Sequence, residues 1–127
     1  MIAKEGRIIL IPLFLVTFPI GVYAHASGNK LLIILYTILG LLFLFCLNFF
    51  RDPARSIPVD KTIVVSPADG KVVKIEEIND PDLGGHARLV SIFLNVFNVH
   101  VNRVPIDGVI ESVERKPGSF LAAFNHL

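Results

Sequence analysis

The chain has 127 residues, of which 53% are hydrophobic, and its formal net charge is +1. A mean hydropathy of +0.64 is too high for a wholly soluble domain and excludes a disordered chain. Residues 51–127 carry nine basic and ten acidic side chains, so the polar part lacks the basic stripe of a nucleic-acid-binding protein. The single cysteine, Cys46, lies in an apolar run, which excludes a disulfide framework and a cysteine-rich zinc site.

Two apolar segments fill residues 1–50, which hold only four charged side chains. The segments are Ile8–Ala24 and Leu31–Phe50, and lengths of about 17 and 20 residues are enough to cross a bilayer. Pro12 and Pro19 lie in the first segment, and a membrane helix tolerates proline better than a soluble helix does. This part of the chain is therefore predicted to be a membrane anchor with two transmembrane helices.

The residues that flank the two segments predict an orientation. A short, turn-rich link, residues 25–30, joins the segments into a transmembrane helical hairpin, and Lys30 is its only permanent charge. The other basic flanking residues are Lys4 and Arg7 before the hairpin and Arg51, Arg55 and Lys61 after it. The positive-inside rule then places both ends in the cytoplasm. We expect the hairpin in the inner (cytoplasmic) membrane, with the polar domain on the cytoplasmic side.

Two other interpretations of the apolar segments stay open. Basic residues, an apolar stretch and then Ala24-His25-Ala26 also fit a signal peptide cleaved after Ala26, which would export the polar part. Two buried helices of a soluble protein would be a third interpretation. It is the weakest, because the 77 remaining residues could not cover both helices.

The polar part reads as short strands separated by turns, without helical periodicity. This predicts a mainly β domain, a partial β-sandwich or barrel, over residues 51–127. The predicted strands are Thr62–Val65, Lys71–Ile78, a long β-rich stretch over Arg88–Val104, and Val109–Glu114.

The long β-rich stretch changes the parity of its polar residues. Asn98, His100 and Asn102 share one parity, opposite to the polar positions before residue 96, so a bulge or tight bend is predicted near Val96-Phe97. Three polar residues around a histidine form a candidate site, although an exposed sheet face would give the same pattern. Asp69 alone reads as a turn residue. No second His or Cys stands at ligand spacing from His100, so no metal site is expected.

Several motifs together resemble the phosphatidylserine decarboxylase family, in its short membrane-anchored prokaryotic form. The resemblance covers about residues 48–127. The motifs are Phe50-Arg51-Asp52-Pro53, Ser66-Pro67-Ala68-Asp69-Gly70-Lys71-Val72, the run from Ser91 to Arg103, then Pro105, Gly108, and Pro117-Gly118-Ser119-Phe120-Leu121-Ala122-Ala123-Phe124-Asn125.

The resemblance implies a proenzyme that makes a pyruvoyl group from an internal serine in a Gly-Ser-Ser-like or Gly-Ser-Arg-like triplet. This chain contains no such triplet. We therefore expect it to consist of the anchor and the first part of the β chain, and to have no decarboxylase activity on its own. The resemblance assigns Asp69 and His100 to catalysis, with His100 as the base for self-cleavage, the later proton donor, or both. It assigns Asn102 and Arg103 to the substrate phosphate, since Arg binds phosphate as a fork.

The function implied is a pyruvoyl-dependent carboxy-lyase that converts phosphatidylserine to phosphatidylethanolamine and CO2 in phospholipid biosynthesis. The partners implied are phosphatidylserine in the membrane and a pyruvoyl-bearing α chain, with no nucleic acid and with a homodimer left open. The alternative is a non-enzymatic membrane-anchored β module that binds anionic lipid or a partner protein.

Overall fold

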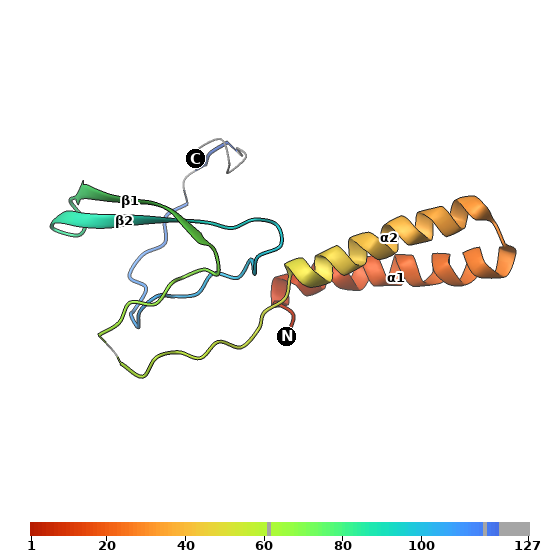
Figure 1. Cartoon of the computed structure of the whole chain (residues 1–127), viewed down its shortest axis with the longest axis horizontal. Coiled ribbons are helices and arrows are strands. Elements are labelled where there is room, and N and C mark those ends of the chain that lie inside the picture. Colours follow the sequence, from red (N-terminus) through yellow and green to blue (C-terminus); the bar gives the residue numbers. More distant parts are fainter. Residues whose placement is uncertain (61, 116, 120–127) are drawn as a thin grey trace. The chain divides into compact units, whose positions relative to one another are not determined.

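The computed structural model describes all residues except 61, 116 and 120–127. It contains two helices, α1 (Lys4–Ser27) and α2 (Lys30–Phe49), followed by two strands, β1 (Lys71–Asp80) and β2 (Gly85–Phe93) (Figure 1). The chain forms two compact units: Met1–Ser56 with Val96–Val101, and Ile57–Asn95 with Asn102–Leu127. Two apolar helices followed by β structure confirm the coarse prediction. The C-terminal part of the Pro117–Asn125 motif lies outside the described residues.

The helices form a hairpin with a two-residue connection. Gly28 ends α1 at φ 64°, a left-handed conformation that glycine adopts without strain. Asn29 then caps α2, because its side-chain oxygen accepts hydrogen bonds from the amides of Leu31 at 3.0 Å and Leu32 at 3.4 Å. The predicted six-residue link was therefore too long. Both neighbouring helix ends extend into it.

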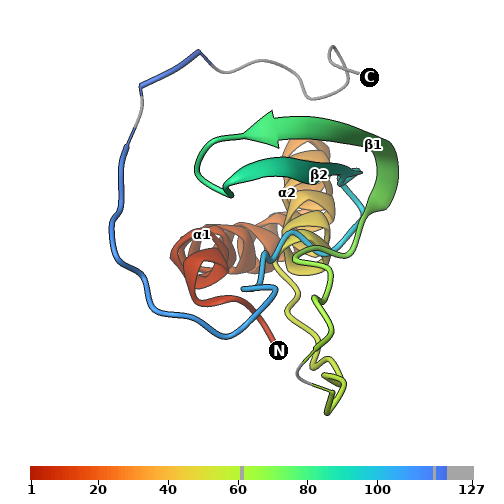
Figure 2. The same cartoon turned by 90° about the vertical axis from the view of Figure 1, so that its left-hand side faces the viewer.

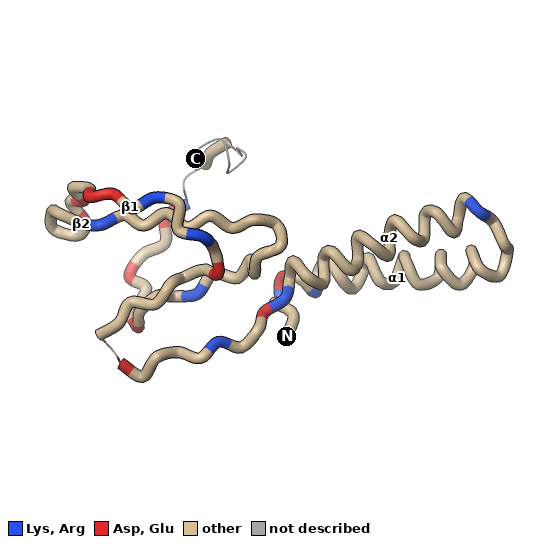
Figure 3. Tube along the Cα trace, in the orientation of Figure 1, with Lys and Arg blue, Asp and Glu red and all other residues tan. Residues whose placement is uncertain are grey.

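Both helices are long and apolar enough to cross a membrane. They have 24 and 20 residues and mean hydropathies of 2.0 and 2.6, and α1 continues through Pro12 and Pro19. Charged residues lie only near the two ends of the hairpin (Figure 3). Most of the large apolar side chains of both helices are exposed, as in Ile8 and Leu31, which differs from the buried core helix of a soluble protein.

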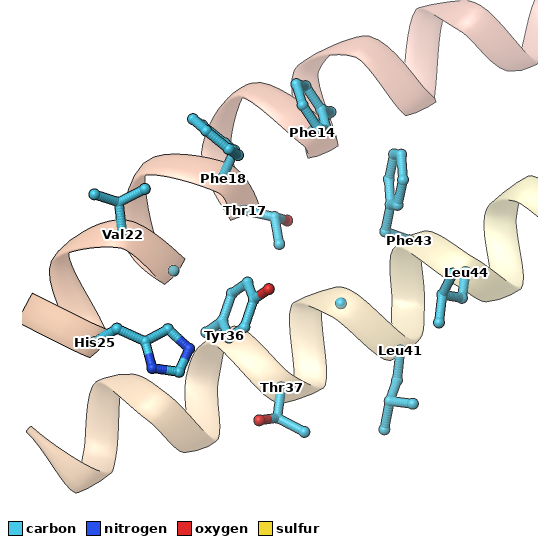
Figure 4. Close-up of a pocket in the computed structure, with 12 residues that line it drawn as sticks. Phe14, Thr17, Phe18, Val22, His25, Tyr36, Thr37, Leu41, Phe43 and Leu44 are labelled. Carbon is cyan, nitrogen blue, oxygen red and sulfur yellow. The ribbon is translucent and has the colours of Figure 1, made fainter. Parts of the chain in front are cut away.

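A glycine and an aromatic pair mark the contact between the two helices. A Cβ added to Gly21 would lie 2.5 Å from the Tyr36 ring, so only glycine fits beneath that ring. Farther along, the Phe14 and Phe43 rings meet with centroids 5.9 Å apart. Between these contacts lies an apolar groove of about 560 Å³, beside which the buried Thr17 hydroxyl has no hydrogen-bond partner in the described structure (Figure 4).

The second unit holds a single antiparallel hairpin of β1 and β2 (Figure 2). Its register pairs Lys71 with Phe93 and Asp80 with Gly85, with an irregularity between Val72 and Lys74. The prediction of a strand from Lys71 to Ile78 is thus confirmed and extended by two residues.

The described residues form no sandwich or barrel, because their sheet has only two strands. Thr62–Val65 and Val109–Glu114 are not strands, and β2 ends at Phe93 instead of continuing to Val104. A strand needs a neighbour for its main-chain hydrogen bonds. No described segment pairs as a strand with residues 109–114, whose apolar side chains are almost fully exposed.

Candidate functional site

The segment that carries His100 bends at the predicted place. The chain leaves β2 at Phe93 and turns at Val96-Phe97, which confirms a tight bend there. Residues 98–102 are not a strand, so the alternative of an exposed sheet face is wrong for His100. Asn98 contributes its main-chain oxygen, which lies 3.0 Å from the His100 Nδ1 atom.

This contact determines which ring nitrogen of His100 carries the hydrogen of the neutral imidazole. A main-chain carbonyl oxygen can only accept a hydrogen bond, so Nδ1 must be the donor. The lone pair then resides on Nε2, which is the nitrogen able to take up or deliver a proton. The local chain conformation thus leaves the His100 Nε2 atom without its hydrogen in the neutral ring, and the acid–base role of His100 stays a prediction.

The imidazole of His100 rests on an aromatic ring from the end of α2. Its plane is inclined by only 20° to the Phe49 ring, with centroids 4.1 Å apart. The neighbouring Val99 is 2% exposed, and the Phe97 ring meets the Phe45 edge at 6.5 Å. Residues 96–101 therefore pack against the last turns of α2 within the first unit.

Arg51 fastens the same segment by hydrogen bonds. One guanidinium nitrogen, Nη2, donates to the main-chain oxygen of Phe97 at 3.0 Å. The other, Nη1, donates to the main-chain oxygen and the side-chain oxygen of Asn48. The main chain around Arg51 is also tied to the N-terminus, since the Ala3 amide donates to Phe50 and the Asp52 amide donates to Met1.

Asp69 lies in the second unit, in the tight turn that leads into β1. Ser66 shapes this turn, because its hydroxyl donates to the Ala68 oxygen at 2.8 Å. A Cβ on Gly70 would lie 2.5 Å from the main-chain oxygen of Phe93, so the turn passes directly over the end of β2. Within the Ser-Pro-Ala-Asp-Gly motif, Gly70 is therefore required for close packing against β2, and Asp69 is the candidate catalytic residue.

The two predicted phosphate-binding residues also belong to the second unit. The Arg103 amide donates to the Pro67 oxygen at 2.9 Å, which brings the main chain of residue 103 beside the turn that contains Asp69. Arg103 is half-buried and Asn102 is exposed. These three predicted residues therefore share one compact unit, whereas His100 belongs to the other. The pairing of Asp69 with His100 stays a prediction.

Two residues that hold the His100 segment were not singled out as site residues by the sequence. Phe49 appeared there only within an apolar segment, and Arg51 only within a motif and as a basic flanking residue. The sequence held no signal for either contact, because both join the end of the second apolar segment to residues more than 40 positions later. Within residues 1–60, 62–115 and 117–119, no group of three His, Cys, Asp or Glu side chains is placed to hold a metal ion.

Comparisons with known proteins agree on one family. The family model of phosphatidylserine decarboxylase matches residues 42–127. The phosphatidylserine decarboxylase proenzymes of Ralstonia nicotianae and Cupriavidus pinatubonensis are 40% and 42% identical to this chain over 97% of its length and 54% of their own. That of Chlorobium chlorochromatii is 57% identical over 65% of this chain and 39% of its own length. The chain spans about half the length of the first two relatives. No solved structure matches it.

Proposed function

The chain belongs to the phosphatidylserine decarboxylase family, and we propose that it is the N-terminal part of an enzyme that converts phosphatidylserine to phosphatidylethanolamine and CO2. The match over residues 42–127 carries the proposal, because it includes Asp69 and His100. The names of the relatives support a proenzyme that is processed into two chains. Residues 51–127 would then be part of the β chain, and a pyruvoyl-bearing α chain would be its partner.

The pyruvoyl group would supply an electron sink for the carbanion that forms when CO2 leaves. None of the 127 residues stands in a Gly-Ser-Ser-like triplet, so the serine that becomes this group belongs to the α chain in our proposal. The residues of this chain fit the remaining acid–base work. His100 has its Nδ1 hydrogen engaged by Asn98, which leaves Nε2 to exchange protons with a reacting group.

His100 would act first as the base that activates the serine hydroxyl and later as the acid that protonates the product carbon. Asp69 would orient His100 and stabilise its charged form, as the carboxylate of a catalytic triad does. Arg103 and Asn102 would bind the phosphate of the lipid, Arg103 through its guanidinium fork.

We further propose that α1 and α2 insert into the inner membrane as a hairpin with both ends in the cytoplasm. The main-chain hydrogen bonds between residues 1–3 and 50–52 bring the two ends of the hairpin together, so their basic residues face one side. Lys4, Arg7, Arg51 and Arg55 belong to this end, whereas Lys30 stands alone at the other. A membrane-impermeant amine reagent should label Lys30 from the periplasmic side. Labelling only from the cytoplasmic side would contradict the hairpin.

The decisive experiment joins the C-terminal half of the R. nicotianae relative after Leu127 and follows self-cleavage and release of CO2. We expect this fusion to mature and to decarboxylate phosphatidylserine. His100→Ala should lower cleavage, decarboxylation or both by about 10²–10⁴-fold, the usual contribution of a general acid or base. His86→Ala is the matched control, because His86 is an exposed histidine on β2.

Two further variants test the remaining roles. Asp69→Asn should act like His100→Ala or more mildly, since it keeps the size and loses the charge. Arg103→Ala should leave cleavage intact and raise KM. A His100→Ala fusion that matures and turns over at the parental rate would refute the assignment. A fusion that stays inactive yet binds anionic vesicles would favour the non-enzymatic module.

A further inference from the structure

The His100 ring packs against the last turn of α2. A stack with centroids 4.1 Å apart and planes within 20° restricts rotation of the imidazole about its side-chain bonds. The hydrogen bond from Nδ1 to Asn98 restricts the same ring at its edge. Together, these two contacts define both the plane of the ring and the direction in which Nε2 points.

Phe49 is itself held in place by neighbouring rings. The Phe50 ring meets it edge-on at 5.1 Å, and the Phe45 ring lies one turn earlier at 6.0 Å. Phe45 also contacts Phe97, so the aromatic cluster reaches the His100 segment at two points. The imidazole therefore rests on a packed surface and not on a single mobile side chain.

Arg51 adds a polar clamp beside this surface. Its planar guanidinium joins Asn48, in the last turn of α2, to the Phe97 oxygen in the bend before His100. Lysine carries its charge on one nitrogen and cannot bridge the two partners in the same plane. The arginine fork therefore adds a direct link between α2 and the bend, beside the aromatic contacts.

We propose that Phe49 and Arg51 are positioning residues for the catalytic imidazole, which they fix to the end of a membrane helix. This inference rests on the proposed function of His100. It assigns a second role to the apolar hairpin. The last turn of α2 would hold the acid–base group at the level where a helix leaves the bilayer and where a lipid headgroup lies. Neither side chain would contact the reacting atoms.

The test uses the fusion described above and compares three variants of aromatic residues. Phe49→Leu keeps an apolar side chain and removes the stack, and Phe49→Tyr restores a ring. Phe18→Leu is the matched control, because Phe18 stacks on Phe14 within α1 and contacts neither His100 nor Phe97. We expect Phe49→Leu to lower kcat by between about twofold and tenfold, the range that an aromatic pair is worth, with KM unchanged. Phe49→Tyr and Phe18→Leu should keep the parental kcat.

A second pair of variants tests the clamp. Arg51→Lys should lower kcat without changing KM, whereas Arg7→Lys, at an exposed position at the same end of the hairpin, should have no effect. Both substitutions keep the charge, so a general effect of charge at the membrane surface would act equally on the two. Equal effects would overturn the role of Arg51.

Nuclear magnetic resonance of histidine-labelled protein in detergent micelles tests the contact without relying on catalysis. The His100 ring protons should show an upfield ring-current shift that Phe49→Leu abolishes and Phe49→Tyr retains. An unshifted His100 signal in the parental protein would overturn the inference. A second result would also overturn the inference, namely a Phe49→Leu fusion that keeps the parental kcat while the His100→Ala fusion is inactive. In that case the proposed function would still stand. An inactive parental fusion would instead overturn the proposed function, and with it the catalytic role of the stack.

Discussion

Replacing Gly6 by alanine should disturb the joint between the helical hairpin and the His100 segment. Gly6 lies buried in the first turn of α1, directly against Phe50. A Cβ at this position would lie 2.5 Å from the Phe50 Cβ atom and 2.6 Å from its Cγ atom. Because the Phe50 Cβ is bonded to the main chain, it cannot swing away. The substitution must therefore move the backbone that also carries Phe49 and Arg51.

The magnitude follows from two opposing effects. Overpacking a tight contact costs about 1–3 kcal/mol. Exchanging glycine for alanine in a helix contributes about 0.8–1 kcal/mol in the favourable direction. Gly6→Ala should therefore lower the free energy of unfolding by up to about 2 kcal/mol. Gly40→Ala is the matched control, because nothing lies within 4 Å of its added Cβ. It should raise the free energy of unfolding by about 0.8–1 kcal/mol.

The assay is reversible unfolding in mixed detergent micelles, followed by far-ultraviolet circular dichroism, with the His100 ring-current shift measured on the same samples. Gly6→Ala should weaken that shift, and Gly40→Ala should leave it unchanged. If the two variants changed stability by the same amount in the same direction, the close contact between Gly6 and Phe50 would be refuted. The reasoning about the joint would then fail as well.

Three further substitutions test other parts of the structure. Asn29→Ala removes the cap of α2 and should lower hairpin stability by about 0.5–2 kcal/mol in the same unfolding assay. Thr17→Val removes a buried hydroxyl without a partner in the described structure and should raise stability by about 1–3 kcal/mol. Thr37→Val should not, because that hydroxyl already donates to a main-chain oxygen. Gly70→Ala should destabilise the β-hairpin by about 1–3 kcal/mol through its clash with a main-chain oxygen. Gly108→Ala, which meets no atom within 4 Å, is its control, and hydrogen exchange of the strand amides measures the difference.

The sequence was most informative where structure is local and periodic. A charge-free run of about 20 residues predicts α2, and alternation of Val73 and Ile75 with charged residues predicts β1. The limits of α1 were less predictable. Hydropathy marks the apolar stretch, whereas the helix also takes in the charged residues Lys4, Glu5 and Arg7.

For the candidate site, the sequence predicted the local bend but not the contacts between distant residues. The change of parity around residue 96 predicted the bend before His100, because it depends only on neighbouring residues. The stack of His100 on Phe49 joins residues far apart in the chain and leaves no periodic signal. The same holds for Gly70, whose need for glycine arises from β2 and not from its own turn. The strands predicted at Thr62–Val65 and Val109–Glu114 failed for a related reason, since a strand depends on its neighbour more than on its own composition.

The stability of the docked His100 segment depends on two opposing free energies. One is the entropic cost of closing a long loop, and the other is the gain from a few contacts. The hydrogen bond from Arg51 to Phe97 spans 46 residues, and closing a flexible loop of that length costs about 3 kcal/mol by the (3/2)RT ln n relation. A hydrogen bond from a charged donor contributes about 1.5–3 kcal/mol, and an aromatic pair about 0.5–1.5 kcal/mol. Burial of Val99, which is 2% exposed, contributes about 1.5–3 kcal/mol. At its lower end, about 3.5 kcal/mol, the gain only just exceeds the cost, so loss of one contact should reduce docking of the segment. Loss of the Phe49 ring should lower the docked population of His100 while both helices stay folded, which is why kcat and the ring-current shift should fall together.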